Sequence, residues 1–343
     1  MYNVNYLTEN PLEGQCPKVF IKDDTEHIVN FYDNKELIKS IKTNGNEFVY
    51  GDRQWFTNWK VEIIKDNKIV YTDIFNLKDK VVFIKSDAWA LGDNIAWMPY
   101  VEEFRKKHKC KVICSTFFNY FFEEYYKDIM FVEPNIRIGN VYAQYYIGVD
   151  KDKDNFKYCP STYPKSILQK TACDILGLEY KEIVPNTINL ETKTNIEKYI
   201  CISEHSSNLI KNWNLENGWQ EVVNYLNMKG YKVVVISKEE TKLKGIVDKT
   251  GNYPLIERMY DLKNASMFIG VSSGLAWLSW MVGTHVAMIS DYTPPYHEFK
   301  SNMTRIYSKN CRQEIIKKEL DSQVPLNVVI DKLEDYFNEI KLS

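Results

Sequence analysis

Serine, glycine and charged residues gather in a few short loops that follow apolar, strand-like runs. The clearest case is Ser272-Ser273-Gly274, which follows the apolar run 267–271 and precedes a helix-like segment. Backbone N–H groups and hydroxyls at a helix start can hold an anion, and the helix dipole adds to the attraction. Neither the Rossmann nor the P-loop glycine pattern is present. A tight turn that binds no ligand would therefore explain this segment equally well. The segment therefore indicates either a phosphate-binding turn or a plain strand-to-helix turn.

Asp93 lies near the end of a second polar loop, 86–94, which lies between an apolar run and a helix expected over 96–108. A carboxylate at this place could act as a general base and take a proton from an attacking hydroxyl. Aspartate is also a common N-cap residue, so a purely structural role predicts the same residue type. Pro99 lies too far along for a straight helix that starts at Asp93, so we expect an irregular first turn.

Two further loops carry groups that an anionic sugar nucleotide would need. Residues 203–207 contain Glu204 and His205, and Lys211 follows them. A departing pyrophosphate needs positive charge or N–H donors, which Lys211 and a nearby helix start could supply without a metal ion. His205 could equally be a loop histidine with a structural partner. The loop 237–241 could hold a base and ribose, although an ordinary exposed polar loop has a similar composition.

The order of apolar runs predicts two α/β halves behind a small β module. Residues 17–77 contain short β-rich runs, and the clearest hairpin covers 59–75 with Asp66-Asn67 at its tip. Strands then alternate with helices, and the alternation restarts after a polar linker near 185–198. This pattern is typical of parallel sheets, in which ligands bind at the carboxyl ends of strands. We predict an α/β protein with two Rossmann-like domains facing a cleft, preceded by a small N-terminal β-barrel-like module.

Composition excludes several classes of protein. The formal net charge of -2 over 343 residues does not indicate a protein that binds nucleic acid. No apolar run approaches the roughly 18–20 residues that cross a bilayer, and no signal peptide is recognisable, so we expect a cytoplasmic protein without a membrane span. The seven cysteines are scattered without a Cys-x-x-Cys pair, which favours buried free thiols over disulfides or a metal site.

Several of these segments also carry a resemblance, because they follow one another in a characteristic order. The segments are Trp55-Phe-Thr-Asn-Trp59, Leu91-Gly-Asp-Asn-Ile-Ala-Trp97, Cys201-Ile-Ser-Glu-His-Ser206 with Lys211-Asn-Trp213, Ser237-Lys-Glu239, Pro254-Leu-Ile-Glu-Arg-Met259 and Ser273-Gly-Leu-Ala-Trp277. Their order over residues 17–299 resembles that of bacterial autotransporter heptosyltransferases, which are distant relatives of lipopolysaccharide heptosyltransferases.

The resemblance implies a cytoplasmic GT-B glycosyltransferase that moves heptose from ADP-heptose to serine hydroxyls of an autotransporter adhesin or another surface protein. It implies that Asp93 is the catalytic base, that Lys211 contacts phosphate and that Ser273-Gly274 form the pyrophosphate turn. The full set of residues expected to bind the donor is Ser203, Glu204, His205, Lys211, Ser237, Glu257, Ser273, Gly274 and Leu275.

The pattern of strands and helices divides the chain into four regions, with the acceptor and donor roles that the resemblance implies. They are an N-terminal β module at 1–78, an acceptor-side Rossmann-like domain at 79–185, a donor domain at 186–322 and a C-terminal helix at 323–343. The iron-holding cysteine cluster of adhesin-type family members is reduced here to Cys311. One thiol cannot supply four soft ligands, so we predict no metal site and no cofactor beyond the ADP-sugar substrate.

The expected partners are a nucleotide-sugar donor and a protein acceptor, with homo-oligomerisation left open. The reaction we expect is inverting and metal-independent, and inversion rests on the resemblance alone. A transferase that uses another nucleotide sugar or a glycan acceptor remains an alternative. A non-catalytic binding or scaffolding protein on the same fold is a further alternative, and release of ADP would distinguish it from an enzyme.

Overall fold

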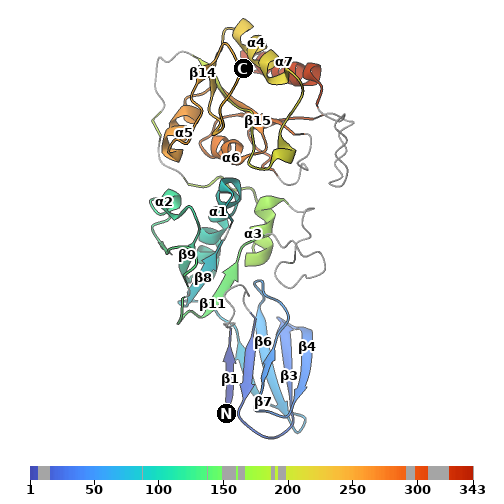
Figure 1. Ribbon diagram of the computed structural model, residues 1–343. Helices are drawn as coiled ribbons and strands as arrows, with labels where there is room; N and C mark the ends of the chain where they lie inside the picture. Colours follow the sequence, from blue (N-terminus) through green and yellow to red (C-terminus); the bar gives the residue numbers. More distant parts are fainter. Residues whose placement is uncertain are drawn as a thin grey trace. The chain divides into compact units, whose positions relative to one another are not determined.

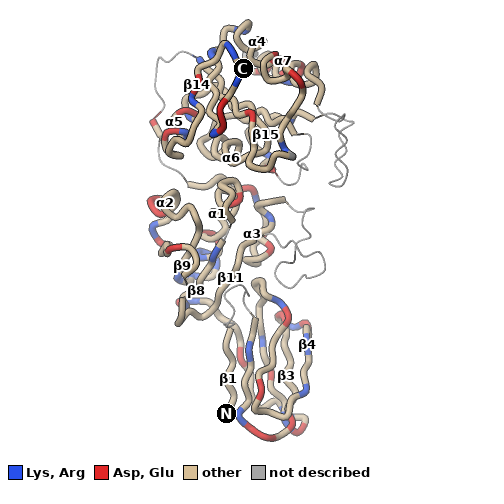
Figure 2. Tube along the Cα trace, viewed as in Figure 1, with Lys and Arg blue, Asp and Glu red and all other residues tan. Residues whose placement is uncertain are grey.

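The computed structural model describes residues 1–6, 16–86, 88–136, 138–148, 160, 167–186, 190–191, 198–290, 298–307 and 324–342. The chain forms two compact units (Figure 1). The first comprises residues 1–89 and 97–183, and the second comprises residues 90–96 and 184–343. Among the described residues, no helix is long and apolar enough to span a membrane. Figure 2 shows acidic and basic residues in both units.

The first unit begins with two antiparallel sheets. One has the strand order β1 (Tyr2–Asn5), β2 (Lys18–Ile21), β5 (Phe48–Tyr50), and the other has β4 (Glu36–Thr43), β3 (His27–Asp33), β6 (Trp59–Lys65), β7 (Lys68–Ile74). Side chains of both sheets share one buried core. The predicted hairpin is confirmed as β6 and β7, and Asp66 and Asn67 at its tip both have positive φ. Closure of these sheets into a barrel remains a prediction.

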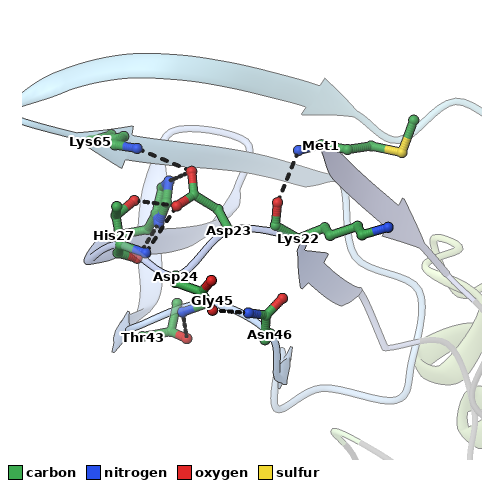
Figure 3. A network of polar contacts seen from close by, with 10 residues as sticks. Met1, Lys22, Asp23, Asp24, His27, Thr43, Gly45, Asn46 and Lys65 are labelled. Carbon is green, nitrogen blue, oxygen red and sulfur yellow. Dashed lines mark hydrogen bonds and ion pairs between the residues drawn. The ribbon is translucent and has the colours of Figure 1, made fainter.

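A polar network fixes one end of this β region (Figure 3). The Asp23 carboxylate accepts hydrogen bonds from the Thr25 hydroxyl at 2.6 Å and from Lys65 at 3.0 Å. These bonds lower the pKa of Asp23 to about 2. Gly45 lies against the same loop with φ +81°, and a Cβ there would be 1.7 Å from the Asp23 carbonyl oxygen. Only glycine fits this position, so backbone packing and charge pairing hold the loop together.

A parallel sheet forms the rest of the first unit. Its strand order is β10 (Ile129–Phe131), β9 (Lys111–Ser115), β8 (Val81–Lys85), β11 (Ala143–Tyr146), and all neighbours are parallel. Its helices are α1 (Leu91–His108), α2 (Asn119–Phe122) and α3 (Leu168–Leu176). Gly177 ends α3 in the left-handed conformation, as a C-cap glycine does, with φ 62°. Helix α1 starts earlier than predicted, and its residues 91–96 belong to the second unit.

The second unit is a six-stranded parallel sheet. Its strand order is β14 (Val247–Asp248), β13 (Lys232–Val235), β12 (Tyr199–Ser203), β15 (Met267–Val271), β16 (Val286–Ile289), β17 (Met303–Ile306). Helices α4 (Gly218–Met228) and α7 (Leu326–Leu342) lie together over one face (Figure 1), where their apolar side chains join a core with alternate strand residues. Helices α5 (Leu255–Lys263) and α6 (Gly274–Met281) contact each other.

The strand order decides where a ligand can bind. From β12 the chain moves outward to β13 and β14, then returns to place β15 on the other side of β12, next to it. In open α/β sheets, ligands bind outside the carboxyl ends of the strands at such a reversal of direction. Ser203 at the end of β12 is paired with Gly270 of β15. The loops that start at Ser203 and at Ser272 therefore flank this position.

Candidate functional site

Hydrogen bonds tie the ends of β12 and β13 together. The buried Ser237 hydroxyl donates to the Ser203 hydroxyl at 3.2 Å and accepts from the Glu204 N–H at 3.1 Å. The Glu204 carboxylate in turn accepts from the Thr241 hydroxyl at 2.5 Å. The two predicted loops 203–207 and 237–241 thus lie side by side.

Lys211 closes a short 3-10 turn, Leu209–Lys211, beyond the first of these loops. The side chain of Asn212 accepts a hydrogen bond from the Ser206 N–H at 2.8 Å, which folds the loop back on itself. Trp213 is buried and donates from its indole N–H to the Val324 carbonyl at 2.9 Å. The backbone on both sides of Lys211 is therefore fixed, while the lysine itself is only partly buried.

Ser273 is the N-cap of α6. Its hydroxyl accepts from the Ala276 N–H at 3.3 Å, and its backbone is extended with φ -150°. A helix start leaves its first N–H groups without intrahelical partners, so the amides of Gly274 and Leu275 are the donors that an anion could reach. The Ser273 hydroxyl caps α6, and it would do so whether or not the turn binds a ligand.

Asp93 lies in the first turn of α1, and this turn packs against the start of α6. A Cβ on Gly92 would be 2.7 Å from Cδ1 of Trp277, and a Cβ on Gly274 would be 3.1 Å from Cβ of Leu91. Both contacts lie within the second unit. The N-cap interpretation of Asp93 is wrong, because α1 begins at Leu91 and Asp93 is already inside the helix. The expected irregular first turn is likewise wrong, since the turn is helical.

Asp93 and Lys211 are coupled electrostatically within the second unit. Burial raises the pKa of Asp93 to about 6, although the positive charge of Lys211 acts in the opposite direction. Burial also lowers the pKa of Lys211, while the charges of Asp93 and Glu298 raise it. Desolvation is the larger effect on both groups, even though a helix N-terminus favours a carboxylate. Asp93 is therefore a stronger base than an ordinary aspartate and is still ionised above neutral pH.

The remaining predicted site residues are less closely joined to this centre. His205 is partly buried, and its backbone carbonyl accepts from the Ser203 hydroxyl at 3.4 Å. Glu257 is exposed on α5, where its N–H donates to the Pro254 carbonyl at 3.0 Å. A donor-binding role for either residue remains a prediction.

No sequence pattern predicts a second buried carboxylate whose charge acts on Lys211. Glu298 is fully buried and is paired with Arg305, and burial raises its pKa to about 7. Glu298 stands alone between polar and aromatic residues, and its partner Arg305 comes from a separate strand, β17. No local pattern could have linked the two, because only the sheet topology brings them together.

No cluster of three or more metal-ligating side chains occurs in the described part of the chain. Cys16, Cys110, Cys114, Cys173 and Cys201 are buried and form no disulfide, as predicted for buried thiols. Cys311 and the Asp152-Lys-Asp154 segment lie outside the described residues, so the prediction that Cys311 holds no metal stays open.

The chain is similar in sequence to curated autotransporter heptosyltransferases. It is 35% identical over 281 residues to Aah of Escherichia coli, an alignment that covers 77% of this chain and 71% of Aah. It is 28% identical over 279 residues to BimC of Burkholderia thailandensis, which is named an inactive autotransporter heptosyltransferase, and this alignment covers 78% and 66% of the two chains. No family model matches the chain.

Among solved structures, the fold is similar to that of TibC from enterotoxigenic E. coli H10407, an iron-containing dodecameric glycosyltransferase. The TM-score is 0.83 at 25% identity, and the match covers 97% of this chain and 98% of TibC. A TibC structure in complex with ADP-D-β-D-heptose gives a TM-score of 0.85 at 24% identity, with 98% and 96% covered.

The parallel sheets and these likenesses define the protein as a glycosyltransferase with an α/β fold of the GT-B-like kind. Within that class, the chain belongs to the autotransporter heptosyltransferase family.

Proposed function

We propose that this protein transfers heptose from ADP-heptose to serine hydroxyls of an autotransporter or another surface protein, with inversion and without a metal ion. The observation that carries the proposal is the coupling of two partly buried, opposite charges, Asp93 and Lys211, within one unit. Asp93 lies against the start of α6, at the reversal of strand order where nucleotides bind in such sheets.

The two charges suit the two halves of a glycosyl transfer. Asp93 accepts the proton of the acceptor hydroxyl as its oxygen forms the new bond to the anomeric carbon. The bond from that carbon to the diphosphate breaks at the same time, and its electron pair leaves with the nucleoside diphosphate. Lys211 and the N–H groups at the start of α6 stabilise this developing charge. Attack from the face opposite the leaving group inverts the configuration, and Asp93 later gives its proton to water.

The other donor contacts are proposed in the same frame. Ser203, Glu204 and Ser237 form one hydrogen-bonded group at the ends of β12 and β13, where a ribose or base could bind. His205 and Glu257 lie in neighbouring loops. The division into a β module, an acceptor-side domain, a donor domain and a C-terminal helix is part of this proposal, as are the cytoplasmic location and a homo-oligomeric assembly.

TibC contains iron, whereas we propose that catalysis here needs none. The proposed neutralisation of the leaving group uses Lys211 and backbone N–H groups, so it assigns no step to a metal ion. Cys311, the residue that the family's iron site would require, belongs to the part of the chain that is not described, and no role is given to it.

The central experiment compares Asp93→Asn with Asp335→Asn, a matched change of an exposed carboxylate on α7. We expect Asp93→Asn to bind ADP like the wild type, because asparagine has nearly the same shape. We expect its transfer of heptose to a co-expressed autotransporter acceptor to fall roughly 100-fold or more, since the general base is lost. Mass spectrometry of the acceptor measures the sugar and its site together. Near-wild-type transfer by Asp93→Asn would remove Asp93 as the base.

A relative named inactive makes a non-catalytic role the second candidate. Release of ADP from ADP-heptose in the presence of acceptor separates the two functions, because a scaffold binds the nucleotide at most. The added mass on the acceptor further separates heptose from another sugar, and the position of that mass in acceptor fragments separates a serine residue from a glycan acceptor.

A further inference from the structure

A stacked pair of aromatic rings lies beyond the carboxyl end of the parallel sheet in the first unit. Trp89 follows β8 and is 78% exposed, and Phe117 follows β9 and is partly buried. Their ring centroids are 3.7 Å apart and their planes differ by 19°. Phe117 therefore covers one face of the indole, and the high exposure of Trp89 leaves the other face open. The proposed reaction assigns no role to either residue.

Hydrogen bonds fix the loop that carries Phe117. The Asn119 side chain accepts from the Thr116 N–H at 2.8 Å and donates to the Val132 carbonyl at 2.6 Å. The Thr116 hydroxyl accepts from the Phe118 N–H at 2.9 Å. The backbone on both sides of Phe117 is thus held, so its ring is a firm support for the indole. A surface that is ordered in advance loses less entropy when it binds a ligand.

The strand order of the first unit places this pair where a ligand can bind. From β8 the chain moves outward to β9 and β10, and β11 then returns to the other side of β8. Ligands of open parallel sheets bind outside the carboxyl ends of the strands at such a reversal. The Ser86 N–H, just after β8, donates to the Ser115 carbonyl at the end of β9 at 2.9 Å, so the two loops start side by side. The first unit thus offers a ligand-binding edge of its own, whereas the proposed donor residues belong to the second unit.

Covalent geometry keeps Trp89 close to the proposed base. Four peptide units join Trp89 to Asp93. A chain spans at most about 3.6 Å per residue, so the two Cα atoms are no more than about 14 Å apart. An extended polypeptide covers that distance with about four residues. A residue within about four positions of a reacting serine can therefore contact the indole while the serine hydroxyl meets Asp93.

We propose that Trp89, supported by Phe117, binds the polypeptide that flanks the acceptor serine. This rests on the proposed transfer to a protein acceptor with Asp93 as the base. A serine side chain is small and offers one hydroxyl, so the residues beside it must supply most of the binding energy of such an acceptor. A tryptophan gives a large contact area for little loss of side-chain entropy, which is why it is frequent among the residues that dominate protein interfaces. The pair is flat and uncharged, so it fits an uncharged, extended segment rather than the diphosphate of the donor.

The test is steady-state transfer of heptose to a purified autotransporter acceptor fragment that carries no sugar. Trp89→Ala should raise the KM for this fragment about 5- to 30-fold. Its kcat at saturating acceptor and its KM for ADP-heptose should stay at wild-type values, because the indole contributes binding and no chemistry. Trp89→Phe keeps a ring over Phe117 and should recover most of the lost affinity. Since Trp89 is largely exposed, Trp89→Ala should melt at the wild-type temperature.

Phe48→Ala is the matched control, because it removes a 49% exposed aromatic side chain from β5 in the β region of the same unit. It should leave the KM for the acceptor unchanged. An equal rise in Phe48→Ala would overturn the proposal, and so would an unchanged acceptor KM in Trp89→Ala. A rise in the KM for ADP-heptose would assign the indole to the donor, and a loss seen only with an acceptor that already carries sugar would assign it to a glycan. Either result would overturn binding of the polypeptide.

A binding measurement separates this proposal from the proposed function. Fluorescence anisotropy of the labelled acceptor fragment gives its Kd for the wild type and for Trp89→Ala without turnover. A wild type that binds the fragment more tightly than Trp89→Ala but transfers no heptose would overturn the proposed function, while it supports the contact with the polypeptide. Transfer by the wild type together with equal Kd values for the two proteins overturns this proposal alone.

Discussion

Replacing Asp93 by asparagine should make the protein more stable while it abolishes most of the transfer. The pKa of Asp93 is about 6 in the folded chain and 3.8 in the absence of structure. At about 1.4 kcal/mol for each factor of ten, the ionised carboxylate costs up to about 3 kcal/mol of folding free energy at neutral pH. Asparagine carries no charge and avoids this cost. A residue whose only task was structural would lose stability on the same change.

The sign follows from proton binding. Between pH 3.8 and about 6 the folded protein holds the Asp93 proton more tightly than the unfolded chain, so stability from this group falls as pH rises through that window. The advantage of Asp93→Asn should therefore be full above about pH 7 and should vanish below about pH 3, where Asp93 is mostly protonated in both the folded and the unfolded wild type.

Urea or thermal unfolding of the wild type, Asp93→Asn and the surface control Asp335→Asn at several pH values measures the difference. The control lies on an exposed part of α7 and should change stability by no more than about 0.5 kcal/mol. A loss of 1 kcal/mol or more in Asp93→Asn at pH 8 would refute the reasoning. It would mean that the attraction of Lys211 outweighs the burial cost, and that Asp93 is a structural charge.

Three further predictions address the rest of the site and the scaffold. Lys211→Ala should weaken ADP binding by about 1.5–3 kcal/mol in calorimetry, because a charge-assisted contact is lost. The control Lys229→Ala removes a surface pair with Glu334 and should leave ADP affinity unchanged. Equal ADP affinities of Lys211→Ala and the wild type would exclude Lys211 from the donor site. Gly177→Ala should lower the melting temperature without changing ADP affinity, since a Cβ there would be 2.1 Å from Cδ1 of Phe56 at a φ of 62°, and an unchanged melting temperature would contradict that packing. Transfer should continue in excess chelator and the purified protein should lack stoichiometric iron, so activity lost on chelation and restored by metal would show that Cys311 or other residues do form a site.

Much of the donor unit could be predicted because its signals are local. The run of five buried apolar residues in β15 is typical of an interior strand of a parallel sheet. Ser273 before an apolar segment predicts a helix N-cap. The prediction places the helix start at residue 96, with an irregular turn before it because of Pro99, whereas α1 begins at Leu91 and accommodates Pro99. Local residue preferences are weak compared with packing, and the contacts of Gly92 with Trp277 hold the first turn in place.

The sequence by itself determined the alternation of strands and helices, the turn residues, the residue types that can hold a diphosphate and the family resemblance. These follow from the periodicity of apolar residues and from the chemistry of single side chains. The tertiary structure alone decided that β15 returns beside β12, that the Asp93 turn packs on α6 and that Glu298 pairs with Arg305. Strand order and long-range packing depend on contacts between residues far apart in the chain. The pKa of Asp93 depends on those contacts too, because burial is a property of the fold and of no single residue.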